Sequence, residues 1–155
     1  RKDVLYQHDH NQELFYSPWR RSLRPLRGIL HATFTFTMGA MLFERLVIWG
    51  TGRNGAAAWR RAGLSQRDLA RARYRSLEEI ESVRYSLTDL DYAGSELKWL
   101  TRGGKQLVRQ LADALAQIEQ AMSTQQAEVA TSSFGPALRR HRAALAHARQ
   151  IYELT

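Results

Sequence analysis

The glycine-rich segment 50–55 has the spacing that most directly predicts chemistry in this 155-residue sequence. It reads Gly-Thr-Gly-Arg-Asn-Gly and matches Gly-x-Gly-x-x-Gly, in which glycines let a backbone turn approach a pyrophosphate at a helix N-terminus. A dinucleotide fold also needs a strand before the turn, here over 45–49, and an acidic residue about 20 positions later for the ribose. Glu78 and Glu79 come later than that, and no segment after residue 63 has the pattern of a buried strand. A nucleotide-binding domain is therefore kept as an alternative interpretation.

Other groupings of reactive side chains predict no site. His8 and His10 flank Asp9, but no third ligand with metal-binding spacing follows them, so no metal is expected. Neither a Ser-His-Asp arrangement nor a pair of carboxylates in an apolar setting is found, so we expect no enzyme and no cofactor. The chain has no cysteine, which excludes disulfides, thiolate zinc sites and cysteine nucleophiles. We expect a cytoplasmic protein.

Positive charge is concentrated in the first half of the chain. Residues 1–75 hold 14 basic and 5 acidic side chains, a net charge of +9, whereas residues 76–155 hold 9 basic and 10 acidic side chains, a net charge of −1. A polyanion such as DNA would be attracted to the first half by neutralisation of its phosphates. The alternative is an arginine-rich surface that is simply solvated.

The hydrophobic patterns predict a mainly α-helical protein with one short strand near the N-terminus. Residues 1–28 contain Pro18 and Pro25 and are expected to form an irregular arm, pinned to the body by aromatic side chains: Tyr6, Phe15, Tyr16 and Trp19. Residues 31–38 alternate polar and apolar side chains with period two, which predicts a strand. Helices are expected over 64–75, 77–87, 105–122 and 137–154, with a polar connection over 123–136. The last two helices are expected to pair as an antiparallel hairpin, within this chain or across a dimer.

The segment 41–63 also fits two helices around the glycine turn. A helix over 41–49 would place Leu42, Leu46 and Trp49 on one face, and Gly50 and Gly52 would end it. A second helix would begin near Asn54, which is a competent N-cap residue. The resulting order is strand, helix, glycine turn and helix.

This order resembles the ribbon-helix-helix family of DNA-binding proteins. The resemblance rests on the alternating residues 33–37, the leucine-containing segment 42–46 and the turn 50–55. It implies a homodimer in which the strands of two chains form an antiparallel ribbon in the major groove of double-stranded DNA. A fainter similarity is to AcaB-type regulators of integrating conjugative elements and plasmids. Together they imply a sequence-specific bacterial transcriptional regulator or an accessory factor of a mobile element.

The resemblance assigns roles to individual side chains. Phe34, Phe36 and Met38 would face the dimer core, and the opposite side of the strand would contact bases through His31, Thr33, Thr35 and Thr37. Phosphates would be contacted by the second helix and the basic arm: Arg53, Asn54, Gly55, Arg60, Arg61, Arg20, Arg21, Arg24 and Arg27. The alternative for residues 31–38 is the edge strand of an ordinary sheet.

Three regions follow from this interpretation. They are a basic and aromatic arm over 1–30, a ribbon-helix-helix-like part over 31–75, and a helical part over 76–155 for dimerisation or contact with a second protein. The uncharged run 28–43 is shorter than the roughly 20 residues that span a membrane, so stable insertion is not expected. A helical scaffold, or a membrane-associated component of a conjugation or secretion apparatus, remains a further alternative.

Overall fold

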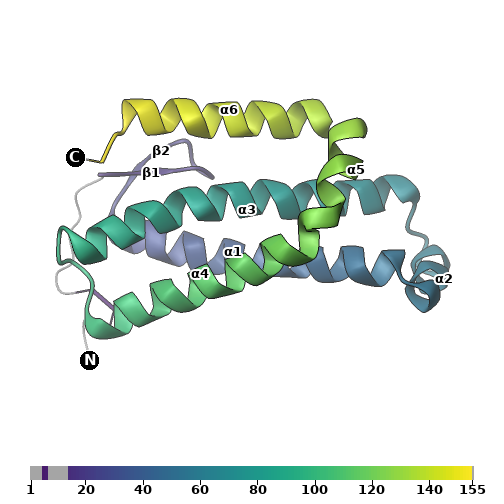
Figure 1. Ribbon diagram of the computed structural model, residues 1–155, viewed down its shortest axis with the longest axis horizontal. Helices are drawn as coiled ribbons and strands as arrows, with labels where there is room; N and C mark the ends of the chain where they lie inside the picture. Colours follow the sequence, from purple (N-terminus) through teal and green to yellow (C-terminus); the bar gives the residue numbers. More distant parts are fainter. Residues whose placement is uncertain (1–4, 7–13, 155) are drawn as a thin grey trace.

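Two long helices lie side by side at the centre of the molecule (Figure 1). The computed structural model describes residues 5–6 and 14–154. The long helices are α1 (Leu26–Thr51) and α3 (Gln66–Ser95), and the other helical elements are α2 (Arg53–Arg61), α4 (Arg102–Met122), the 3-10 turn η1 (Ser123–Gln125), α5 (Gln126–Thr131) and α6 (Gly135–Ile151). The expected mainly α-helical class is confirmed, with a short two-stranded antiparallel sheet near the N-terminus.

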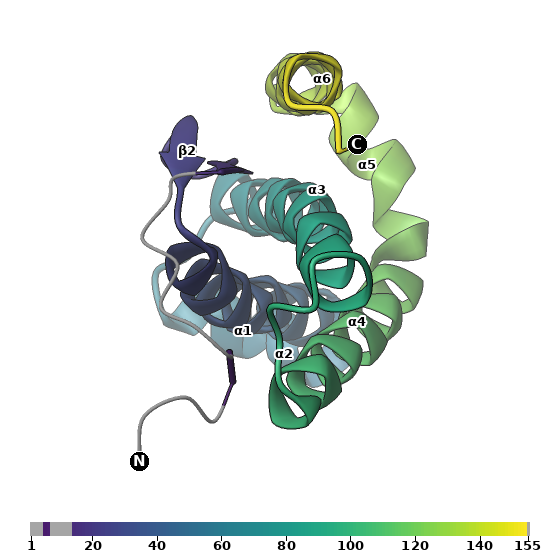
Figure 2. The ribbon, with the colours of Figure 1, turned by 90° about the vertical axis from the view of Figure 1, so that its left-hand side faces the viewer.

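Helix α3 is the element against which most of the others pack. It begins at a capping box, in which the Ser65 hydroxyl accepts from the Asp68 backbone N–H while the Asp68 carboxylate accepts from the Ser65 backbone N–H. Helices α1, α4, α5 and α6 all contact α3. End-on, α4 and α6 lie on different sides of α3 (Figure 2). The predicted pairing of the last two helices within one chain is therefore wrong, because each packs on α3 instead.

The expected irregular arm contains a short hairpin. Strands β1 (Phe15–Ser17) and β2 (Ser22–Arg24) pair antiparallel, with Tyr16 opposite Leu23. The expected pinning by aromatic residues is confirmed: Phe15 packs edge-on against Trp99 and Tyr16 stacks on Tyr152. Trp19 stacks on Phe36 with a ring-centroid distance of 4.4 Å and donates from Nε1 to the carboxylate of Glu79 at 2.8 Å. Tyr6 forms an isolated bridge with Leu100.

The strand predicted over residues 31–38 is wrong, because these residues are the second to fourth turns of α1. The buried residues of α1 recur at helical spacing along the side that faces the interior. They include Ile29, Leu30, Thr33, Thr37, Ala40, Glu44 and Val47. Thr33 and Thr37 keep their hydroxyls satisfied by donating to the carbonyls of Ile29 at 2.7 Å and Thr33 at 2.6 Å. Packing of this face against α3 outweighs the strand propensity of the threonine and phenylalanine residues.

Other expectations about segments are corrected in the same way. The helix expected over 41–49 lies within α1, so the strand over 45–49 that a nucleotide site requires is absent. The two helices expected between 64 and 87 are one helix, and the connection 123–136 contains η1 and α5. The region boundaries expected after residues 30 and 75 fall inside α1 and α3. Helices α4 and α6 are close to their predicted positions.

The uncharged run 28–43 lies in α1. Across residues 5–6 and 14–154, none of the helices is both long enough and apolar enough to cross a membrane.

Candidate nucleic-acid interface

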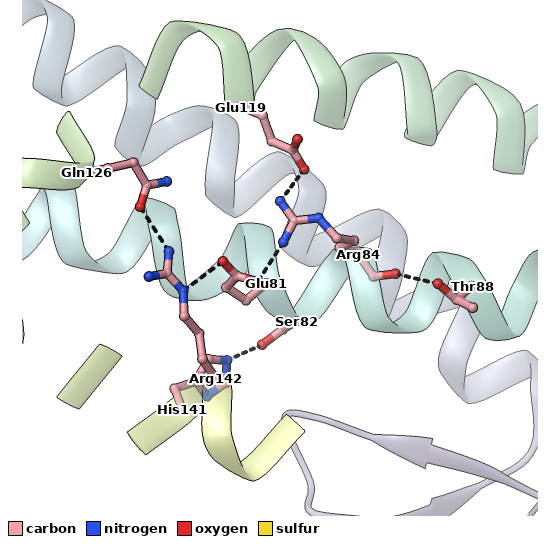
Figure 3. A network of polar contacts seen from close by, with 8 residues as sticks. All are labelled: Glu81, Ser82, Arg84, Thr88, Glu119, Gln126, His141 and Arg142. Carbon is pink, nitrogen blue, oxygen red and sulfur yellow. Dashed lines mark hydrogen bonds and ion pairs between the residues drawn. The ribbon is translucent and has the colours of Figure 1, made fainter. Parts of the chain in front are cut away.

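Two arginines of the second half of the chain, Arg84 and Arg142, form ion pairs that hold helices together (Figure 3). Arg84 of α3 contacts Glu81 at 2.5 Å and Glu119 of α4 at 2.6 Å. Arg142 of α6 contacts Glu81 at 3.0 Å and donates to Gln126 of α5 at 2.9 Å. This network links α4, α5 and α6 to α3, and its guanidinium groups are already occupied by carboxylates.

A buried hydrogen bond between α3 and α6 belongs to the same region. Ser82 Oγ lies 2.8 Å from His141 Nε2, and Ser82 is buried in the middle of α3. Burial lowers the pKa of His141, and the nearby carboxylates of Glu78 and Glu81 oppose that shift. Because the serine is inaccessible, this pair connects two helices and does not present a nucleophile.

We expect the packing of α6 to weaken in mild acid. Because the pKa of His141 is lower in the folded chain than in the unfolded chain, protonation favours unfolding. The contribution of neutral His141 to the stability of the fold is present above about pH 6.5 and is lost as the pH falls through the folded-state pKa. The free energy of unfolding, measured by denaturant titration between pH 7.5 and about 5, should therefore decrease toward acid. The decrease should be smaller in His141→Gln and unchanged in His147→Gln, whose side chain is exposed. Equal profiles for all three proteins would contradict the assignment.

Arginines of the first half have almost no acidic neighbours to pair with. Residues 14–75 contain 12 arginines and two acidic residues, Glu44 and Asp68. Glu44 is buried and lies 3.4 Å from Arg45. Asp68 is held in the capping box of α3, and its hydrogen bonds to Ser65 lower its pKa. Arg75, at the end of this segment, pairs with Glu78 and Glu79 at 2.8 Å each. Most of the other arginines of the segment have no carboxylate close by in sequence.

Five of these arginines lie on α2 and on the first two turns of α3, a region that we call the basic end: Arg53, Arg60, Arg61, Arg67 and Arg71. All five are exposed, and within the part of the chain that the structure describes no carboxylate forms an ion pair with any of them. Figure 1 shows α2 at one extremity of the molecule, beyond the last turn of α1. The basic end therefore lies at the extremity of the molecule where α2 and the start of α3 are found.

Tryptophan side chains hold α2 in this position. Trp59 is only 3% exposed, packs edge-on against Trp49 of α1 and donates from Nε1 to the carbonyl of Ser65 at 3.0 Å. Burial of this side of α2 leaves the adjacent residues Arg60 and Arg61 pointing to solvent. Gly63, with a φ of 77°, makes the turn into α3.

Asn54 and Gly55, which the sequence predicted as phosphate contacts, have other surroundings in the structure. Asn54 is exposed but is not the N-cap of α2, because Gly52 occupies that position without a side-chain hydrogen bond. Gly55 is buried, and a Cβ atom there would lie 1.7 Å from the carbonyl oxygen of Trp49. The missing side chain lets α2 cross closely over the end of α1 and does not serve the approach of a phosphate.

The residues predicted to contact bases are separated by the helical geometry of α1. Thr33 and Thr37 are fully buried, so their prediction as base contacts is wrong. His31 and Thr35 are exposed. They line a groove of about 510 Å³ between α1 and the hairpin, together with Arg20 and Arg24 of the predicted arm. The structure thus brings four of the predicted DNA-contacting residues together in this hairpin groove, some 30 residues along the chain from the basic end.

The other two arginines of the predicted arm, Arg21 and Arg27, do not line the hairpin groove. Arg21 lines a different depression, beside Tyr74 and His141. Arg27 lines an apolar pocket of about 430 Å³ with Leu30 and Phe34. Of the residues expected in a dimer core, Phe34 and Met38 are exposed, whereas Phe36 is half-buried against Trp19.

The motif HDH at 8–10 lies outside the described residues, and the described residues contain no group of three potential metal ligands. Arg67 and Arg71 were not predicted as site residues, although their spacing of four after the capping-box serine is a signal for one exposed helix face. Comparisons with protein-family models, with curated proteins and with solved structures find no match for this chain.

Proposed function

We propose that this chain is a non-enzymatic DNA-binding protein that holds the phosphate backbone of double-stranded DNA through the basic end. One observation carries the proposal: residues 53–71 present five exposed arginines, and the single acidic residue among them is engaged in the helix cap. A cluster of cations without internal partners is an electrostatic footprint for a polyanion.

The arrangement of the arginines suits a phosphate backbone. Arg67 and Arg71 lie one turn apart on the same face of α3, and Arg60 and Arg61 lie at the end of α2. Each guanidinium can donate two parallel hydrogen bonds to one phosphate group. Because α2 is anchored through Trp59, these side chains start from a rigid element.

Such a surface binds DNA with little dependence on base sequence. Contacts to phosphate position a protein on the duplex, whereas sequence is read from base edges or from DNA shape. The ribbon that the sequence predicted as the reader is replaced by a helix. In this proposal the basic end supplies affinity for the backbone, and the exposed residues His31 and Thr35 of the hairpin groove are the remaining candidates for selectivity.

The test is the affinity for a DNA duplex as a function of salt. Arg60→Ala combined with Arg61→Ala should weaken binding by at least about tenfold for every duplex sequence, because charge-assisted hydrogen bonds to phosphate are removed. The slope of the logarithm of affinity against the logarithm of salt concentration should fall by about two.

A matched control makes the same charge change elsewhere. Arg102→Ala combined with Arg109→Ala removes two exposed arginines from the first half of α4, away from the end where α2 lies (Figure 1). The control should retain most of the affinity. An affinity that does not depend on salt, or an equal loss in both double variants, would contradict the proposal.

A further inference from the structure

The outward face of α1 carries a stripe of large apolar side chains that the described residues leave about half exposed. Its members are Phe34, Met38, Leu42, Ile48 and Trp49, each between 39% and 58% exposed. Because successive residues of an α-helix are rotated by about 100°, the five fall within an arc of about 120°. Helices α3 and α4 lie on the other side of α1 (Figure 2). At the end of the stripe Trp59 of α2 packs edge-on against Trp49, and this contact still leaves Trp49 42% exposed. We call these five residues the α1 stripe.

Two α1 stripes packed together would reach the smallest area that a specific interface buries. Five large apolar side chains that are about half exposed present on the order of 500 Å². Monomeric proteins rarely expose a larger contiguous apolar patch. Two such stripes facing each other would bury about 1,000 Å² in total, which is the lower limit for a specific interface.

We propose that the occupant of the α1 stripe is a second copy of this chain, packed with its α1 antiparallel to the first. A two-fold axis between Met41 and Leu42 would place Leu42 next to its counterpart and Phe34 opposite Trp49. The interface would then be self-complementary, as a two-fold interface must be. This inference does not rest on DNA binding.

Charge on the stripe decides the direction of packing. Arg45 is exposed and lies in the middle of the same arc. In a parallel pair the two Arg45 side chains would meet, and like charges in contact are destabilising. In the antiparallel pair Arg45 faces Met38 of the other copy, and the two Arg45 positions are about 10 Å apart along the axis, near the Debye length at 0.1 M salt.

A pocket at the end of the stripe provides the anchor. Leu5, Tyr6, Leu30, Phe34 and Leu107 contribute to an almost wholly apolar pocket of about 430 Å³. In the antiparallel arrangement Trp49 of the second copy lies opposite Phe34, at the mouth of this pocket. Aromatic side chains inserted into such pockets are the usual centres of binding energy at interfaces.

The test measures the oligomeric state of the full chain by sedimentation. We expect a dimer, and Leu42→Asp should raise its dissociation constant by at least about 100-fold, because two carboxylates would meet at the axis. Ile151→Asp is the matched control, since Ile151 on α6 is also 58% exposed. It should dimerise normally, and both variants should show the helical circular dichroism of the parent chain. Added salt should strengthen the dimer, because each copy carries a net charge of +8.

Cysteine cross-linking tests the direction, and the absence of natural cysteines gives a clean background. A mixture of Phe34→Cys and Trp49→Cys chains should form disulfide-linked pairs, and Phe34→Cys alone should not. A monomer at high micromolar concentration, a dimer unaffected by Leu42→Asp, or cross-linking of Phe34→Cys alone would overturn the proposal. So would a monomeric chain that binds phosphatidylserine vesicles and loses that binding in Leu42→Asp, because the stripe would then face a lipid surface.

Discussion

Gly55→Ala is expected to lower the free energy of unfolding by about 3 kcal/mol, at the upper end of what an added methyl group costs in a packed interior. The added Cβ would lie 1.7 Å from the carbonyl oxygen and 2.6 Å from the carbonyl carbon of Trp49. Both are backbone atoms, so the clash is relieved only by moving α2 away from the end of α1. Such a movement would also disturb the buried Trp59 and with it the presentation of Arg60 and Arg61.

Gly39→Ala is the control for this prediction. Gly39 also lies inside a helix, but apart from the adjoining backbone of α1 nothing lies within 4 Å of the position that its Cβ would take. Alanine is favoured over glycine inside a helix by about 0.5–1 kcal/mol, so this variant should be slightly more stable than the parent chain. Chemical denaturation followed by circular dichroism gives both values, and a similar change in the two variants would contradict the close crossing of α1 and α2.

Arg149→Ala is expected to destabilise the fold by about 3 kcal/mol, because it removes the partner of a buried carboxylate. Asp89 of α3 is 2% exposed, and its Oδ1 lies 2.5 Å from Nη1 of Arg149. The same guanidinium donates to the carbonyl of Tyr85 at 3.0 Å and lies 3.8 Å from the centre of the Tyr85 ring. Without it, an ionised Asp89 would have no compensating charge between α3 and α6.

The pH dependence identifies the cause of this loss. Burial raises the pKa of Asp89, and Arg149 acts against that rise, so removal of the arginine should raise the pKa further. A carboxyl whose pKa is higher in the folded state is tolerated best when protonated, so the deficit of Arg149→Ala should shrink as the pH falls toward 4. Asp89→Asn in the same chain should recover part of the stability at neutral pH. A deficit independent of pH would assign the effect to lost packing over Tyr85.

Apolar patterns that are sustained over several helical turns predicted the later helices well. The apolar residues of 105–122 recur every three or four positions over five turns, and α4 is found over Arg102–Met122. The cap at Ser65 and Asp68 is local, since a side chain contacts the backbone three residues away, and it starts α3 in the structure.

The segment 31–38 was misread because two periods fit it. The alternation of threonine with phenylalanine has the period of two that is typical of a strand. Ile29, Thr33, Thr37 and Ala40, however, have the spacing of three or four that places them on one face of a helix. Threonine is compatible with both, because a hydroxyl in a helix can donate to the carbonyl four residues earlier. The adjacent helix α3 decides between them, and that contact joins residues far apart in the sequence.

By itself, the amino-acid sequence determined the mainly helical class, the positions of the later helices and the excess of positive charge in the first half. These properties depend on composition and on neighbours within a few turns. Only the tertiary structure decided that residues 31–38 are helical and that Gly55 serves a helix crossing. It also decided that Arg84, Arg142 and Arg149 are ion-paired, whereas the arginines of the basic end have no ion pair with a carboxylate of residues 5–6 or 14–154. Those outcomes depend on distances between side chains that lie 35 or more residues apart or on different helices, and such distances are set by packing.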